Sequence, residues 1–455
     1  MTNPRQIHLA TFIYPFAQRS SWRHPDVQAD MALDIDYYRA VTKVSEDAKF
    51  DAVFLADSYS GDYPIAHPEA RARLPGVSVF EPLSLMSVLS AHSEKIGLIY
   101  TAGTTYEEPY MVARALASLD HLSKGRAGWN LVTTKNPKTS ANFGKDEHML
   151  HGERYRRAAE FLDVVKGLWD SFEDDAFVLD KEAGIYFDIE KSHTLDHQGE
   201  FFSVAGPLRI ARPPQGHPVV SQAGSSESGR DLGARTADII FTAHQTLEDG
   251  QDFYRDVKQR AAAAGRDPSE VLILPGASVI WGETDEIAWQ RHEEMQALIH
   301  PDVGLRTLES ICGVDLSGYP LDGPLPDLPE TNESKSQQQV AVNLARREGL
   351  TIRQLYLRVA NSYRHHVIVG STRTIADDLE QWFTEGAADG FVLFAPYMLK
   401  GFTEFATHVV PELQRRGLFR KEYEGSTLRE HLGLARPANR YATQAASTAR
   451  LARAG

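Results

Sequence analysis

Eight short apolar segments recur along the chain and alternate with stretches of helical periodicity, and this alternation constrains the possible fold more than any other feature. The segments are Ile7–Phe12, Ala52–Asp57, Ile96–Gly103, Gly125–Thr134, Pro218–Gly224, Asp238–Ala243, Val271–Ile280 and Gly390–Ala395. Between them, apolar residues return every three or four positions, as at Val112, Leu116 and Leu119, which predicts amphipathic helices. Strands that alternate with helices in this way predict a parallel sheet.

A parallel sheet of eight strands favours closure into a barrel, an α/β fold of the TIM-like (β/α)8 type. The alternative is an open, doubly wound sheet. Two fingerprints of nucleotide-binding open sheets, G-x-G-x-x-G and G-x-x-x-x-G-K, do not occur in the sequence. We therefore predict the barrel.

Three connections are too long for simple barrel loops and are interpreted as insertions, at about residues 58–80, 170–212 and 284–367. The last is the largest, and its polar, proline-rich middle (VDLSGYPLDGPLPDLPETNESKSQQQ) is typical of a lid or of a disordered segment. Residues 1–436 are predicted to form one barrel domain with these insertions, and residues 437–455 a loosely held C-terminal tail.

Charge and cysteine content narrow the class of protein. The formal net charge of −14 disfavours a nucleic acid or an anionic membrane as a partner. The single cysteine, Cys312, excludes an internal disulfide and fits a reducing compartment. No stretch approaches the ~20 apolar residues of a membrane span. The N-terminus lacks the pattern of a secretion signal, so we expect a cytoplasmic location.

Two histidine pairs raise the question of a metal site. His193 and His197 are four residues apart, and His365 and His366 are adjacent. Neither pair has an obvious further ligand nearby, and the H-E-x-x-H motif does not occur. No metal site is predicted.

Polar residues at the ends of several predicted strands indicate a binding site, because the carboxyl ends of barrel strands form the active site in this kind of fold. Asp57 ends the second strand, Thr104 follows the third, and Asn130 stands in the otherwise apolar fourth. Each position alone could equally be structural. Together they are better explained by one ligand that has a hydrogen-bonding ring and an anionic group.

The stretch QAGSSESGRD is the best candidate for the anion site. Ser225 and Ser226 follow the fifth strand, and a helix is expected to start near Glu227, so free backbone N–H groups and two hydroxyls would converge there. An ordinary serine helix cap is the alternative.

A second candidate is the segment HGERYRRAAEF. His151 and Tyr155 are four residues apart, so they share one face near the start of a helix. The alternative is that the tyrosine simply packs in the core.

Several motifs, in this order, resemble one known family. They are SWRHPD (Ser21–Asp26), FLADSY (Phe54–Tyr59), GRAGWNLVTT (Gly125–Thr134), NFGKDEHMLHGERYRRAAEF (Asn142–Phe161), TLDHQGEFFSVAGPL (Thr194–Leu208), QAGSSESGR (Gln222–Arg230) and AADGFVL (Ala387–Leu393). The sequence is similar to the FMN-dependent two-component monooxygenases of the bacterial-luciferase superfamily, in the subgroup of nitrilotriacetate and dibenzothiophene-sulfone monooxygenases. The resemblance covers about residues 5–436.

The resemblance implies a luciferase-like barrel with insertions and FMN at the carboxyl ends of its strands. Carried over by position, Asp57 and Thr104 would lie beside the isoalloxazine, and Asn130 would hydrogen-bond the flavin and act in catalysis. His151 and Tyr155 would contact the ribityl–phosphate side. Ser225 and Ser226 would hold the phosphate. His24, in SWRHPD, is our choice for a catalytic group on the substrate side.

The resemblance also implies the chemistry and the partners. Reduced FMN reacts with O₂, and one oxygen atom is transferred to a small organic substrate by C–N, C–S, C–C or C–H oxidation. A separate NAD(P)H:FMN reductase would supply the reduced flavin by diffusion, and the chain would form a homodimer or homotetramer. Two alternatives stay open: a deazaflavin-dependent oxidoreductase of the same superfamily, and a flavin-binding protein without catalysis.

Overall fold

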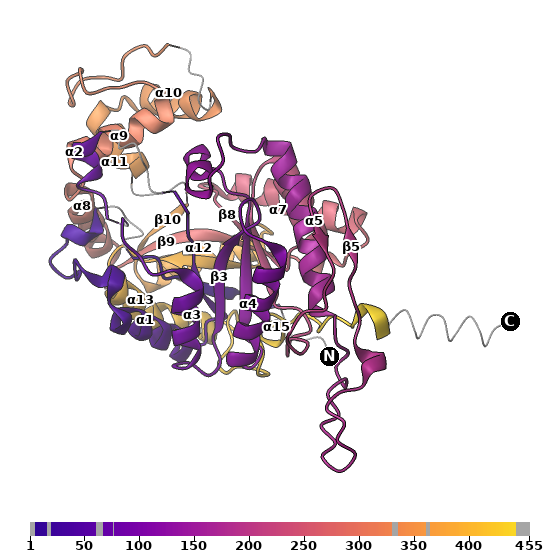
Figure 1. Cartoon of the computed structure of the whole chain (residues 1–455). Helices are drawn as coiled ribbons and strands as arrows, with labels where there is room; N and C mark the ends of the chain where they lie inside the picture. The colour runs from indigo at the N-terminus through magenta and orange to yellow at the C-terminus, as the bar shows by residue number, and fades with distance from the viewer. Residues whose placement is uncertain are drawn as a thin grey trace.

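The barrel wall consists of eight parallel strands that lie in the order in which they occur along the chain (Figure 1). The computed structural model describes residues 5–15, 20–60, 67–75, 77–329, 335–360 and 365–442. The wall strands are β1 (His8–Phe12), β2 (Ala52–Leu55), β3 (Gly97–Gly103), β4 (Ala127–Val132), β7 (Val219–Ala223), β8 (Ile239–Thr242), β9 (Leu272–Trp281) and β11 (Gly390–Phe394). Each lies at one of the eight predicted segments, so the predicted TIM-like barrel is confirmed.

The barrel closes through β1, which pairs with β2 on one edge and with β11 on the other, where His8 lies opposite Gly390. Strand β9 is unusually long, and one of its edges has two partners in succession. Residues 272–275 pair with β8, and residues 277–281 pair with a ninth strand, β10 (His366–Gly370). Strand β10 was not predicted. It begins inside the range assigned to the third insertion. Its five residues directly follow a polar stretch, so the sequence pattern does not mark where the strand starts.

Helices cover the outer face of the wall, as expected for a parallel sheet that is buried on both faces. They are α1 (Ile35–Asp47), α3 (Pro82–Ser90), α4 (Pro109–Leu122), α5 (His151–Trp169), α6 (Glu227–Thr236), α7 (Leu247–Ala263), α8 (Asp285–Ala297), α12 (Thr372–Thr384), α13 (Leu399–Glu404) and α14 (Val410–Arg415), with a π-helical turn, Phe405–Val409, between the last two. Helix α3 shows how such helices begin. Pro82 occupies its first position, and the Glu81 carboxylate accepts hydrogen bonds from two free backbone N–H groups.

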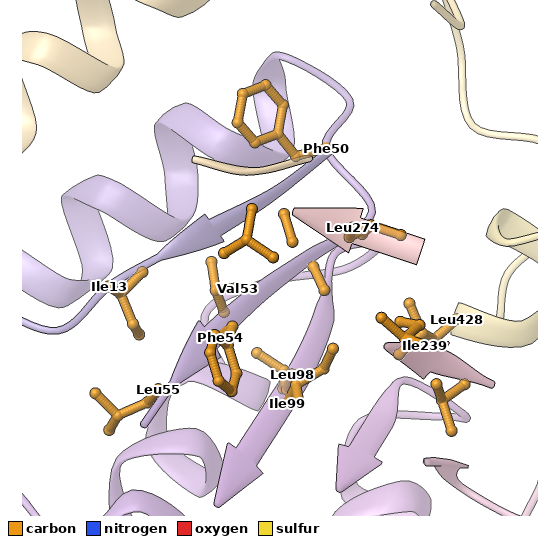
Figure 2. Close-up of a cluster of buried hydrophobic side chains, with 14 of the residues drawn as sticks. Ile13, Phe50, Val53, Phe54, Leu55, Leu98, Ile99, Ile239, Leu274 and Leu428 are labelled. Atoms are coloured by element: carbon orange, nitrogen blue, oxygen red, sulfur yellow. The ribbon is translucent and has the colours of Figure 1, made fainter. Parts of the chain in front are cut away.

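The barrel core is filled by side chains from the strands and is closed at its amino end by the C-terminal part of the chain. Every residue of β3 and β9 is buried. Figure 2 shows part of this core, with Phe54 and Ile99 on the neighbouring strands β2 and β3. A Cβ on Gly97, the first residue of β3, would lie 2.5 Å from Cδ1 of Leu428. The glycine therefore lets Leu428 pack against the amino end of the barrel.

The segment around Leu428 is tied to the barrel by a buried ion pair and by hydrogen bonds. It contains the short helix α15 (Leu428–His431), in which Arg429 lies 2.9 Å from the Asp238 carboxylate. Farther along, the Asn439 side chain donates hydrogen bonds of 3.0 Å to the carbonyls of Asp170 and Phe172, and it is buried. The predicted tail boundary at residue 437 falls inside this ordered segment, and residues 443–455 lie outside the described part of the chain.

The first and third insertions meet in a helical cluster beside the open, carboxyl end of the barrel (Figure 1). Its helices are α2 (Pro68–Arg71), α9 (Pro301–Cys312), α10 (Lys335–Glu348) and α11 (Ile352–Ala360). The cluster has a small apolar core of its own, which includes Leu308, Leu316 and Tyr356. A Cβ on Gly304 would lie 2.3 Å from the Tyr356 ring, so α9 and α11 can approach closely only because residue 304 is glycine. We call this cluster the helical lid.

The second insertion contains the short antiparallel pair β5 (His197–Gln198) and β6 (Ser203–Val204), and a loop that projects away from the barrel (Figure 1). That loop exposes Ile185, Tyr186 and Ile189. Short 3-10 helices occur at Ser21–Arg23, Met31–Leu33, Pro137–Phe143, Ile189–Lys191 and Pro268–Glu270. Within the described residues, none of the helices is both long enough and apolar enough to cross a bilayer.

Candidate active site

A cavity of about 530 Å³ opens at the carboxyl end of the barrel. Residues that follow or end seven of the wall strands line it, so it lies where an active site is expected in this fold. The lining residues are Phe12, Tyr14, Phe54, Ala56, Asp57, Ser58, Tyr59, Thr101, Gly103, Asn130, Val132, Thr133, Thr134, Lys135, Asn136, Ala223, Phe241, His365 and Phe394.

Asn130 presents an unpaired amide oxygen in the wall of this cavity. Its side-chain N–H₂ donates to Oγ1 of Thr101 at 2.8 Å, and that hydroxyl donates in turn to the Leu55 carbonyl at 2.8 Å. This chain of hydrogen bonds fixes which way the amide points. Oδ1 of Asn130 is buried and has no hydrogen-bond partner among the described residues. A buried acceptor without a partner is costly, so the site is suited to a ligand that brings an N–H or O–H donor.

Thr104, another residue of the predicted site, does not line the cavity. Side chains alternate along a strand, so Thr101 and Gly103 share the inner face of β3. Thr104 comes just after the strand and is fully buried, with its hydroxyl and its backbone N–H both directed to the Val132 carbonyl. The hydroxyl of Thr104 is therefore already used within the fold. Thr101, which the sequence analysis passed over, occupies the cavity wall instead.

Asp57 is the only carboxyl among the described residues that line the cavity, and it lies near a second half-buried acid, Glu107. Burial raises the pKa of Asp57, and nearby Glu81 adds to the shift. Glu107 accepts hydrogen bonds from the Tyr59 hydroxyl and, at 2.5 Å, from the backbone N–H of Gly103. Burial raises the pKa of Glu107 as well. Tyr59 and Glu107 thus join the loop after β2 to the end of β3, a role that sequence analysis missed.

An aromatic wall faces these polar groups. Phe12 lies 5.5 Å from Phe54 and 4.5 Å from Phe394 between ring centroids, and Phe241 lies 6.2 Å from Phe394. His365 stacks on Phe394 at 4.4 Å. Such a wall provides flat apolar surface for a planar ligand and keeps water away from it.

His365 enters the cavity because of its place at the start of β10. The side chain of its neighbour, His366, points toward helix α12, where Nε2 lies 2.6 Å from the Asp378 carboxylate. The His365 ring fits above Gly276, since a Cβ there would lie 2.4 Å from Nδ1. Burial lowers the pKa of His365 to about 4, so its imidazole is neutral at neutral pH. The sequence drew attention to this histidine only as a metal ligand.

A second group of predicted residues meets at the start of helix α6. Ser226 is the N-cap of α6, where its Oγ accepts from the backbone N–H of Gly229 at 3.2 Å and lies 3.4 Å from the Tyr155 hydroxyl. The ring of His151 is 4.9 Å from that of Tyr155, and Ser225 is exposed alongside. We call His151, Tyr155, Ser225 and Ser226 the hydroxyl cradle. Free N–H groups of a helix start together with hydroxyls are suited to an anion.

Gly224 allows the close approach on which the cradle depends. A Cβ at this position would lie 3.2 Å from Cα of Gly229 and 3.4 Å from the Tyr155 hydroxyl. Glycine at residues 224 and 229 thus lets the strand end, the helix start and the tyrosine meet. The QAGSSESGR motif encodes this arrangement locally.

His24 lies apart from both groups. Its ring packs edge-on against Tyr397 with centroids 4.7 Å apart, and its Nδ1 accepts from the backbone N–H of Asp26 at 3.1 Å. It does not line the cavity. Its part in catalysis stays a prediction, as do the ligand contacts of the other residues. No group of three or more His, Cys, Asp or Glu side chains suited to a metal occurs in the described part of the chain.

Comparison with known proteins places this barrel and cavity in a family. A family model described as luciferase-like monooxygenase matches residues 13–389. N-acetyl-S-(2-succino)cysteine monooxygenase of Bacillus subtilis (strain 168) is 49% identical over 96% of this chain and 99% of its own length. Nitrilotriacetate monooxygenase component A of Aminobacter aminovorans is 51% identical over 92% of this chain and 94% of its own.

The fold comparison agrees. The crystal structure of a riboflavin lyase with modified FMN and its substrate riboflavin superposes with a TM-score of 0.83, at 33% identity, over 95% of this chain and 97% of that one. The family match and the two relatives each span most of the barrel, its insertions and the cavity. The chain therefore belongs to the family of luciferase-like monooxygenases.

Proposed function

We propose that the chain is the oxygenase component of a two-component system, which uses reduced FMN and O₂ to oxygenate a small organic substrate. The observation that carries the proposal is the unpaired Oδ1 of Asn130 in a cavity whose opposite wall is aromatic. The printed name of one relative, component A of a nitrilotriacetate monooxygenase, adds support for a system with a second component.

The described residues fit FMN at both of its ends. The isoalloxazine ring has N–H groups that match the free acceptor of Asn130. The phosphate has the charge that a helix start and hydroxyls favour. We assign the ring to the cavity near Asp57 and Asn130, and the phosphate to Tyr155, Ser225 and Ser226, with His151 beside them.

The chain's own residues would position the flavin, exclude water and hold protons in place. When bound, reduced FMN supplies the electrons with which O₂ is activated for transfer of one oxygen atom. Asn130, fixed through Thr101, orients the ring. Asp57, with its pKa raised by burial, keeps a carboxyl proton available at higher pH than an exposed aspartate does. Phe12, Phe54 and Phe394 line a water-poor space for the substrate.

The proposal is tested by measuring which compound can supply the electrons for the reaction. The purified chain with FMN, NADH and O₂ should not oxygenate a substrate, whereas adding an unrelated NAD(P)H:FMN reductase or photoreduced FMN should start the reaction. Nitrilotriacetate and N-acetyl-S-(2-succino)cysteine, taken from the names of the two relatives, are the first substrates to try. Steady turnover by the chain alone with a pyridine nucleotide would overturn the two-component proposal, and binding of a deazaflavin in preference to FMN would overturn the cofactor.

A further inference from the structure

Lys135 stands at the rim of the cavity, on a segment that is fixed in place. It follows β4 by three residues and lines the cavity, and its side chain is exposed. The next residue, Asn136, donates to Oγ of Ser60 at 2.6 Å and accepts from the backbone N–H of Lys138 at 3.0 Å. These bonds hold the backbone at Lys135 against the loop that follows β2.

Lys135 is the one fixed positive charge among the described residues that line the cavity. The other basic group there, His365, is neutral because burial lowers its pKa to about 4. No hydrogen bond or ion pair joins the Lys135 ammonium to another described residue. Other lysines of this acidic chain do have such partners. Lys258, for example, lies 2.9 Å from the Asp389 carboxylate.

An ammonium that faces a cavity and has no partner in the protein is suited to an anion in the ligand. We propose that the substrate is a small organic acid whose carboxylate pairs with Lys135, while the part to be oxygenated lies against the aromatic wall. This inference rests on the proposed function and adds the class of substrate. Lys135 follows β4 and His365 precedes β10, so such a molecule would span the cavity from one wall toward the other.

The FMN phosphate is the other anion that Lys135 could meet. The hydroxyl cradle supplies its own donors for that phosphate, and none of its four residues lines the cavity that Lys135 faces. The two possibilities differ in one measurable respect. A lysine that serves the phosphate affects the affinity for FMN but not for riboflavin, and a lysine that serves the substrate affects neither.

The test uses Lys135→Gln, Lys135→Arg and, as a matched control, Lys138→Gln, which changes an exposed lysine three residues away that does not line the cavity. Each full-length variant is assayed with reductase, NADH, FMN and a panel of matched pairs. Nitrilotriacetate, N-acetyl-S-(2-succino)cysteine, simple thioether acids and simple N-acetylated amino acids are each paired with the methyl esters of all their carboxyl groups. Binding of FMN and of riboflavin is titrated in parallel by fluorescence.

We expect the unchanged enzyme to oxygenate acids of the panel and to discriminate against their esters. Lys135→Gln should raise KM for the acid about tenfold, the loss expected for one charge-assisted contact, with kcat within a factor of about two. Lys135→Arg should restore most of the affinity, and Lys138→Gln should behave as the unchanged enzyme. Higher ionic strength should raise KM for the acid only, because an exposed pair is screened by salt.

Three results would overturn the inference: esters preferred to acids, no acid of the panel accepted by an enzyme that binds FMN, or weaker FMN binding in Lys135→Gln with riboflavin binding unchanged. Failure of the proposed function looks different. In that case the unchanged chain either does not bind FMN or turns over without an added reductase.

Discussion

Asn130 shows how a single residue can be arranged for a ligand at the expense of the free protein. Its N–H₂ group is satisfied by Thr101, whereas its buried Oδ1 has no partner among the described residues. Leaving such an acceptor unpaired costs about 1–3 kcal/mol. Binding of a donor would remove that cost, so the residue should matter to affinity more than to folding.

Replacement of Asn130 by leucine, which has a similar size and no polar atoms, should separate these two effects. We expect FMN to bind about tenfold more weakly, because the acceptor for its N–H is lost. The ligand-free protein should be as stable as the unchanged one, or up to about 1 kcal/mol more stable. Thermal unfolding with and without FMN measures both quantities. A leucine variant that binds FMN normally would remove Asn130 from the flavin site.

The two serines of the hydroxyl cradle should differ, although sequence alone treats them alike. Ser226 caps helix α6 through the backbone N–H of Gly229, whereas Ser225 is exposed and caps nothing. Ser226→Ala should therefore lower the free energy of unfolding by about 1 kcal/mol, and Ser225→Ala should leave it unchanged. The double variant should weaken FMN binding by about 1–3 kcal/mol.

Riboflavin, which lacks the phosphate, is the control ligand for these serine variants. Its affinity should not change in Ser225→Ala, in Ser226→Ala or in the double variant. An equal loss for FMN and riboflavin would mean that the serines act on the ring rather than on the phosphate.

A residue of the site could be predicted only where its neighbours in the sequence reveal its role. Asn130 stood out because an amide interrupts an apolar strand, and Ser225 and Ser226 because they follow a strand and open a helix. Tyr59 and Glu107 gave no such signal. Their meeting at the end of β3 depends on the barrel bringing two strand ends together, and no spacing in the sequence encodes it.

At the scale of elements, the eight wall strands were readable because strands buried on both faces need unbroken apolar runs. Strand β10 pairs only with the C-terminal half of β9, residues 277–281, among the described strands. It therefore does not need an unbroken apolar run of the same length as the wall strands. Because β10 was not predicted, the direction of the His365 side chain into the cavity was not predicted either. Once β10 is seen, alternation along a strand explains why His366 meets Asp378 outside while His365 faces the cavity.

The helical lid depends on one close contact between helices α9 and α11. Gly304→Ala would place a Cβ 2.3 Å from the Tyr356 ring, so the two helices must move apart. We expect trypsin to cut the variant faster at lid residues such as Arg306, Arg353 and Arg358, with the barrel left intact. Gly318→Ala is the matched control, since no described atom lies within 4 Å of a Cβ added there. Cleavage that starts in the barrel helices would contradict an independently opening lid.

At the scale of the whole molecule, the C-terminal segment holds the amino end of the barrel through a buried ion pair. Burial disfavours the charged form of Asp238, but Arg429 and the Val220 N–H outweigh this effect and hold the pKa of the carboxyl below its usual range. Arg429→Met would leave a buried carboxylate without its cation. Breaking such a pair costs about 3–5 kcal/mol.

Denaturant unfolding measures this loss. The double change Arg429→Met with Asp238→Asn should recover part of it, because the uncompensated charge is then gone. FMN binding per folded molecule should stay unchanged in both variants, because the pair lies at the end of the barrel away from the cavity. A single variant as stable as the unchanged chain would show that the segment closes the barrel without contributing to its stability.

Closure of the amino end by Leu428 also has a consequence for the order in which the molecule can form. Strand β1 must wait for β11, which is made some 380 residues later, and the amino end of the wall must wait longer still for Leu428. A ribosome synthesises the chain at about 5–20 residues per second. Until β11 has been made, the first strand has an open edge, and until Leu428 has been made, the amino end of the barrel is not closed. The barrel therefore cannot be completed before residue 428 has been synthesised.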